Sequence, residues 1–168
     1  MLAAFVLGAV LTIDAPKSNA TFTVSHVFVG HVTGTVPIVS GTIDIPPGAR
    51  VPARVSAVLD PKKIKTDEPD RDAALQGPDW FDTALFPQWT FVSTAITPTA
   101  TGFTMDGLLT IHGVSQPEEL TVTVGGEAAH PSYHATGFID RHAFGMKRIQ
   151  LDPAIGNPVS VTLDIVTQ

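Results

Sequence analysis

Apolar side chains recur at every second residue in eight separate stretches of this 168-residue chain. A period of two places apolar groups on one face of a β-strand and polar groups on the other. In residues 20–29, for example, Phe22, Val24, His26 and Phe28 share one face. We therefore predict an all-β chain, and its 14 glycines and 14 prolines suit short connections between strands.

The eight predicted strands follow a short extended stretch at residues 11–14. They span residues 20–29, 35–45, 51–60, 88–96, 102–112, 119–124, 132–141 and 159–166. Pro37 marks a bulge or an edge position within the second of them. Eight antiparallel strands with short turns are typical of a closed barrel, which we expect here, and strand counting leaves a two-sheet sandwich open.

One long connection, residues 61–87, interrupts the strand pattern. It contains a predicted short helix over residues 70–76, which Gly77 and Pro78 end. Its large apolar side chains are too numerous for a solvated loop; they are Leu75, Trp80, Phe81 and Phe86. We predict that residues 62–86 cover one opening of the barrel.

The inward faces of the predicted strands are rich in aromatic residues, with small residues such as Ala57 and Gly107 opposite them. This combination as a whole predicts an apolar tunnel, although each aromatic residue taken alone is more typical of a packed core. Each buried methylene of a bound hydrocarbon contributes about 0.8 kcal/mol, so such a tunnel selects a lipid chain. The expected lining is Phe22, Val24, Phe28, Trp89, Phe91, Phe103, Met105 and Leu109.

Composition and motifs exclude several other classes of function. Ten basic residues against sixteen acidic ones, a net charge of −6, make a nucleic-acid partner unexpected, and the absence of cysteine excludes thiolate chemistry. His130 and His134 would lie about 13 Å apart on one strand, too far to share a metal ion. We expect no catalytic residue, no metal and no cofactor, and we leave a homodimer open.

Residues 1–11 form an almost wholly apolar segment that is too short for a membrane span. It is predicted to be the remnant of a secretory signal or a first strand, and a start inside a longer N-terminus is a third alternative. A signal would place the protein in the periplasm or outside the cell, and the cytoplasm is not excluded. The rest of the chain, residues 12–168, is the predicted barrel domain.

Six ordered motifs resemble the YceI-like family of bacterial lipid-binding proteins. They are Thr12–Ser18 with Phe22–His26, Ser40–Ile43, Arg71–Leu75 with Asp79–Asp82, Phe86–Pro87 with Phe91 and Ser93, Leu109–Val114, and Gly137–Arg141 with Phe144–Gly145. The resemblance implies a lipocalin-like barrel that binds a polyisoprenoid or similar amphipathic lipid, usually in the periplasm. Four positions depart from the family pattern: Lys17, Thr33, Leu108 and Glu118.

A lipid in an apolar tunnel leaves its polar end at an opening, because burying an unpaired phosphate is prohibitive. Arg71 and Arg141, the latter near Phe144, are the candidate cations at such an opening, and pairing with Asp72, Asp79 or Asp140 is their alternative role. His26 is either a polar group in the tunnel wall that contacts the ligand or a histidine whose hydrogen bonds are made to other groups within the barrel.

We therefore predict a non-enzymatic carrier or store for an isoprenoid lipid, such as a quinone or a polyprenyl phosphate. The first alternative is an enzyme that acts on such a lipid, which needs an acid–base pair facing the tunnel. The second is a stress-related accessory module that requires no ligand.

Overall fold

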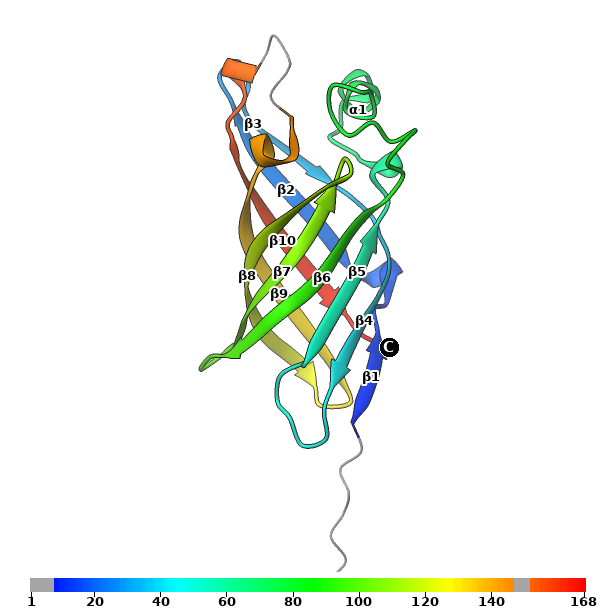
Figure 1. The fold of residues 1–168 in the computed structure, drawn as a ribbon, viewed down its shortest axis with the longest axis vertical. Coiled ribbons are helices and arrows are strands. Elements are labelled where there is room, and N and C mark those ends of the chain that lie inside the picture. Colours follow the sequence, from blue (N-terminus) through cyan, green and yellow to red (C-terminus); the bar gives the residue numbers. More distant parts are fainter. Residues whose placement is uncertain (1–7, 147–151) are drawn as a thin grey trace, which may run out of the picture.

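The computed structural model describes residues 8–146 and 152–168, and they form one sheet of ten antiparallel strands that curls into a barrel (Figure 1). The strands are β1 (Ala9–Thr12), β2 (Asn19–His26), β3 (Gly30–Thr35), β4 (Ile38–Ile45), β5 (Arg54–Leu59), β6 (Trp89–Pro98), β7 (Gly102–Ile111), β8 (Val114–Glu127), β9 (His130–Asp140) and β10 (Pro158–Val166). Their order in the sheet is β1-β4-β5-β6-β7-β8-β9-β10-β2-β3. The single sheet rules out the sandwich.

The prediction of eight strands is wrong by two, and both errors lie near the N-terminus. Residues 30–34, expected as a connection, pair with β2 together with Thr35 as strand β3, and Val36 and Pro37 separate β3 from β4. Proline interrupts the ladder because it has no N–H to donate. Residues 9–12 pair with Ile45–Thr42 of β4 as strand β1, upstream of the stretch expected at 11–14.

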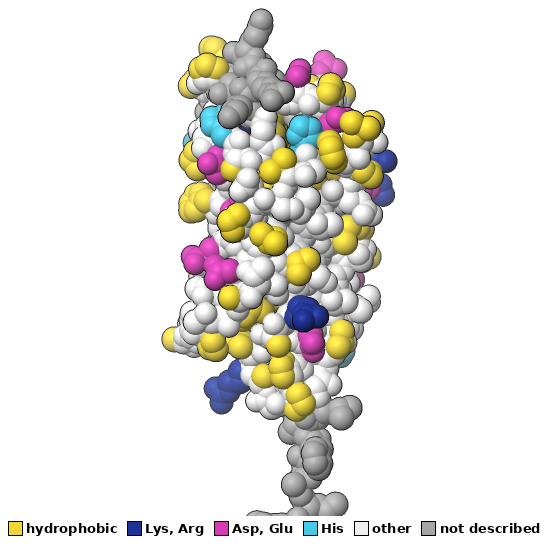
Figure 2. All heavy atoms as spheres, in the orientation of Figure 1, with side chains coloured by type: hydrophobic (Ala, Val, Ile, Leu, Met, Phe, Trp, Pro, Cys, Tyr) yellow, Lys and Arg dark blue, Asp and Glu magenta, His cyan; other side chains and the backbone are white. Residues whose placement is uncertain are grey.

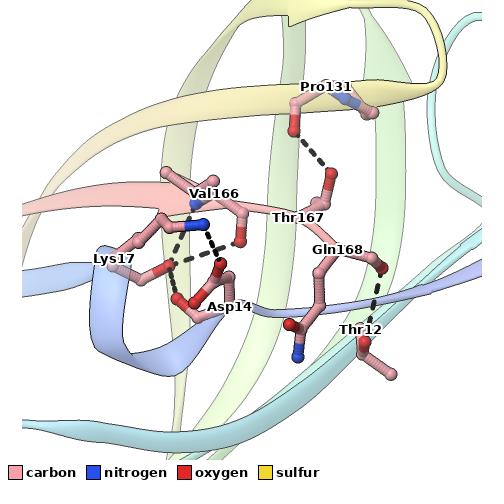
Figure 3. A network of polar contacts seen from close by, with 8 residues as sticks. Thr12, Asp14, Lys17, Pro131, Val166, Thr167 and Gln168 are labelled. Carbon is pink, nitrogen blue, oxygen red and sulfur yellow. Dashed lines mark hydrogen bonds and ion pairs between the residues drawn. The ribbon is translucent and has the colours of Figure 1, made fainter.

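The two edges of the sheet are β1 and β3. Short isolated bridges close the barrel at two places. At one end Ile13 bridges Thr167, while its N–H donates to Gly41 on β4 at 3.0 Å. Figure 3 shows the polar contacts around this bridge, among them Thr12 with Gln168 and the 2.8 Å ion pair of Lys17 with Asp14. At the other end, Thr35 and Lys65 exchange backbone hydrogen bonds of 2.8 and 3.0 Å.

The helix α1 (Pro69–Leu75) lies at one end of the barrel, which we call the α1 end (Figure 1). Glu68 caps it by accepting a hydrogen bond from the Asp70 N–H. The turns β4–β5, β6–β7 and β8–β9 lie at the opposite end (Figure 1). Three 3₁₀ helices accompany the strands at Ala15–Lys17, Pro61–Lys63 and Arg141–Phe144, and a fourth spans Asp152–Ala154.

Alternate residues of each strand point inward and build the core, as the period of two predicts. Phe103, Val122 and Ile43 are among the most buried of these residues. The face of the outer wall that Figure 2 shows carries few charged groups and scattered apolar ones. Phe138 of β9 is 71% exposed. At Gly107 an added Cβ would lie 2.2 Å from the Phe91 ring, so glycine leaves the space that this ring occupies.

Candidate functional site

The barrel contains two adjoining cavities. The inner cavity, about 150 Å³, lies among the strands. The outer cavity, about 410 Å³, lies under residues 62–86, which we call the covering segment. Both are lined by the same five residues, Phe22, Trp89, Ile111, Ile139 and Val161. The two spaces therefore lie against the same five side chains, and together they form one candidate binding site.

The walls of the inner cavity are almost entirely apolar. Phe91, Met105 and Leu109 line it as expected, together with aliphatic side chains from most strands. An apolar cavity of this size stays dry and accepts small apolar groups. Its chemistry therefore suits a hydrocarbon chain.

The outer cavity is bounded on one side by the covering segment. Leu75 and Trp80 are half-buried against the core and line it, and Phe81 is buried. The Phe81 ring meets Trp89 edge-on, with centroids 4.6 Å apart. The segment holds its own shape through hydrogen bonds such as Phe81 N–H to Leu75 O, 3.0 Å. Val24 and His26 of β2 also line this cavity.

Four of the expected apolar site residues lie outside both cavities. Phe28 is 75% exposed in the β2–β3 turn, so the prediction that it lines the tunnel is wrong. The alternation that runs through Phe22 and His26 ends where β2 ends, before residue 28. Phe103 and Phe144 are fully buried in the core, and Phe86 packs edge-on against His112.

His26 is half-buried and offers a polar group to the outer cavity. Its Nδ1 accepts a hydrogen bond from the Phe28 N–H at 3.3 Å. A neutral imidazole that accepts at Nδ1 carries its proton on Nε2. His26 is thus both satisfied locally and able to donate from its other nitrogen.

Arg71 lines the outer cavity from α1, and Thr66 holds it there. Its Nε donates to Thr66 Oγ1 at 2.8 Å and its Nη2 to Thr66 O at 2.7 Å. The Asp72 carboxylate accepts hydrogen bonds from the backbone N–H and the hydroxyl of the same threonine. The predicted partnership with Asp72 therefore runs through Thr66, and Arg71 Nη1 has no hydrogen-bond acceptor in the described part of the chain.

Arg141 is only 3% exposed, although it also borders the outer cavity. Its guanidinium donates to the carbonyl oxygens of Gly156 (2.9 Å), Ile155 (2.8 Å) and Met146. These bonds tie the end of β9 to the segment that leads into β10. Arg141 therefore has a structural role, and a lipid headgroup would have to compete with three backbone oxygens for its guanidinium.

Glu118 is a polar group in the inner cavity that the sequence analysis noted only as a departure from the family pattern. Its half-buried side chain alternates inward with Leu120 and Val122 on β8. Burial raises the pKa of the Glu118 carboxyl to about 6, with the charge of Asp140 adding to the rise. Residue 118 is an even number of residues from Leu120 and Val122, and this alternation could have predicted from the sequence that Glu118 points inward.

Replacing Glu118 with glutamine is expected to stabilise the protein near pH 7.5 and to change nothing near pH 4. The raised folded-state pKa means that protonated Glu118 contributes stability below about pH 4.5, which is lost as the pH rises through about 6. Urea unfolding should show a gain of about 1 kcal/mol at pH 7.5, allowing for solvent screening. Glu119→Gln, on the exposed outer face, is the matched control. A gain that is the same at both pH values would contradict this account.

No group of three or more histidine, aspartate or glutamate residues within 8–146 and 152–168 is placed to hold a metal ion. In the same part of the chain, no helix combines the length and apolar character that crossing a membrane requires.

Comparison with known families and sequences gives consistent matches. The model of the YceI-like domain matches residues 11–167. Among curated proteins, the UPF0312 protein of Shewanella sp. (strain MR-4) is 29% identical over 174 residues, covering 99% of this chain and 89% of the relative. The UPF0312 protein of Shewanella baltica (strain OS185) is 28% identical over 171 residues with the same coverage.

Solved structures share the fold at lower identity. The crystal structure of Burkholderia cenocepacia BcnA superposes with a TM-score of 0.84 at 22% identity, over 93% of this chain and 99% of that one. A polyisoprenoid-binding domain from Saccharophagus degradans, implicated in plant cell wall breakdown, gives 0.71 at 16% identity, over 94% and 97%.

Proposed function

The chain belongs to the YceI-like domain family, and from that premise we propose that it binds an isoprenoid or other amphipathic lipid and carries or stores it without chemical change. The observation that carries the proposal is the pair of adjoining apolar cavities inside the barrel, which share five lining residues. The polyisoprenoid-binding neighbour with the same fold supports it. The hydrocarbon tail occupies the inner cavity and the polar end lies in the outer one.

Organic extraction of the purified protein followed by mass spectrometry tests this function. We expect a lipid with an isoprenoid chain, enriched over an extract of an unrelated protein prepared in the same way. A protein that carries no lipid and binds none when prenyl lipids are added would contradict the proposal. That result would favour an accessory module without a ligand.

The alternative of an enzyme acting on the lipid needs an acid and a base close to the same part of the bound chain. The titratable side chains that line the cavities include His26 in the outer one and Glu118 and Tyr133 in the inner one. In the described part of the chain no hydrogen bond joins any two of these three groups, so we propose binding rather than catalysis. A periplasmic or secreted location and a homodimer remain predictions, which cell fractionation and sedimentation would test.

Substituting Arg71 by glutamine is expected to weaken binding of a phosphorylated isoprenoid much more than binding of a neutral prenyl quinone. Arg71 is the cation that borders the outer cavity with Nη1 unengaged, and a phosphate gains far more from a charged donor than a carbonyl does. Titrations of both lipids should show a loss of tenfold or more for the phosphate and threefold or less for the quinone, on the order of the value of a charged hydrogen bond. Equal losses would mean that Arg71 only holds Thr66 and α1 in place.

A further inference from the structure

The ladder of paired residues between β8 and β9 stops before either strand ends. Its last pair toward the α1 end is Thr121 with Thr136. Both strands run on from there, β8 paired to β7 and β9 paired to β10. Residues 114–120 and 137–140 therefore have no register pair between these two strands within the described part of the chain.

Pro117 gives a reason in the sequence for this break. The β7–β8 hairpin turns through two residues with positive φ, His112 (54°) and Gly113 (71°), a turn that closes on a hydrogen-bonded pair, here Ile111 with Val114. Hydrogen-bonded and non-hydrogen-bonded pairs alternate along an antiparallel ladder. Counting from the turn, the backbone of residue 117 is directed at β9, where proline has no N–H to donate.

The inner cavity and a groove on the outer wall meet the same residues at this break. Glu119 and Phe138 are exposed, on the outward faces of β8 and β9, yet both line the inner cavity. They also line the groove, about 530 Å³, together with Val161, an inward residue of β10. The register partner of Val161 on β9 is Gly137, which has no side chain to separate the two spaces. Residues of both faces of the wall thus border both spaces, as expected where a wall is open.

Two contacts frame the break. On the side of the paired ladder the strands still approach closely, because a Cβ added at Gly137 would lie 2.7 Å from the Glu119 carbonyl oxygen. On the side of the α1 end, Gln116 Nε2 donates to the Ala143 carbonyl oxygen at 3.0 Å. We call the part between these contacts, residues 117–119 of β8 and 138–140 of β9, the lateral window. Widening it separates no register pair of the sheet.

The other way into the cavities, at the α1 end, is closed by the covering segment. Phe81 of that segment is buried and packs on Trp89, with ring centroids 4.6 Å apart. The Phe81 N–H donates to the Leu75 carbonyl oxygen at 3.0 Å, and Arg71 donates twice to Thr66. A chain that entered here would have to displace these contacts. The lateral window therefore opens at a lower cost in broken contacts.

We propose that the bound lipid enters and leaves the barrel sideways through the lateral window, and not under the covering segment. Ile139 on the border of the window lines both cavities, so the chain and the polar end have the same way in. Phe138 on the outer lip provides an apolar surface for the arriving chain. This inference rests on the proposed lipid binding and adds its route.

Blocking the window with a removable group tests the route. The chain contains no cysteine, so Glu119→Cys gives a single thiol on the outer lip, which a bulky aromatic methanethiosulfonate modifies selectively. Stopped-flow fluorescence with a dansyl-labelled farnesyl chain as the probe measures uptake and release. We expect both rates to fall by about tenfold or more while the dissociation constant, their ratio, changes by less than about threefold. A reducing agent, which removes the blocking group, should restore both rates.

Asp44→Cys, modified in the same way, is the matched control, since it also replaces an exposed acid on the outer face of a strand, here β4. Its rates should stay within about twofold of the wild-type rates. Unchanged rates in the blocked Glu119→Cys protein would overturn the window and assign the route to the α1 end. A weaker affinity without slower release would also overturn it. If the wild-type protein binds no probe, the proposed function itself fails.

Discussion

Replacing Phe91 by alanine is expected to lower the free energy of unfolding by about 3–5 kcal/mol. The Phe91 ring is 8% exposed, lies on Gly107 and forms part of the inner cavity wall. Its removal strips the wall of a large apolar group and enlarges a cavity that water does not fill. Urea unfolding without added lipid measures the loss.

The matched control is Val92→Ala on the outer face of the same strand, where Val92 is 47% exposed. We expect that variant to change stability by about 0.5 kcal/mol or less. If Phe91→Ala lowers the free energy of unfolding by only about 1 kcal/mol and alters lipid affinity, Phe91 mainly lines the binding site and contributes little to the core.

Arg141→Gln is expected to destabilise the protein by about 3 kcal/mol or more. The substitution leaves the carbonyl oxygens of Met146, Ile155 and Gly156 without this donor. The first of these hydrogen bonds is buried and the other two are partly buried, and an unsatisfied buried acceptor costs about 1–3 kcal/mol. Binding of phosphorylated and neutral isoprenoids should fall together, because the wall of the outer cavity loses its anchor. Urea unfolding and titration with both lipids measure these effects.

Arg54→Gln, on the exposed face of β5, provides the control for removing a positive charge from the surface. It should change stability by about 0.5 kcal/mol or less. An Arg141→Gln protein that unfolds like the wild type but loses only the phosphorylated lipid would contradict the structural role and make Arg141 a headgroup contact.

Periodicity was enough to predict the all-β class, most strand positions and the inward aromatic residues, because side-chain direction alternates strictly along a strand. The same rule failed at Phe28, since alternation says nothing about where a strand ends. It also missed β3, whose polar and glycine-containing sequence, Gly30–Thr35, has only one large apolar residue, Val32. That strand is fixed by its neighbours β2 and Lys65 rather than by its own sequence.

The polar features of the site depended on tertiary contacts that spacing does not encode. Arg71 and Arg141 were both candidate cations in the sequence, yet one donates to a threonine beside the cavity and the other to three backbone oxygens. Trp89 was predicted only as an apolar wall. Its Nε1 makes no hydrogen bond within the described part of the chain, and residue spacing does not predict this.

The affinity of a series of prenyl benzoquinones with increasing tail length tests the central claim, that the apolar barrel interior binds an isoprenoid chain, most directly. Each isoprene unit buried in the cavities contributes up to about 4 kcal/mol, at about 0.8 kcal/mol for each methylene equivalent. We predict that affinity rises at least tenfold with each of the first added units and then levels off once the inner cavity is full. Affinity that is independent of tail length, or the absence of binding throughout the series, would contradict the claim.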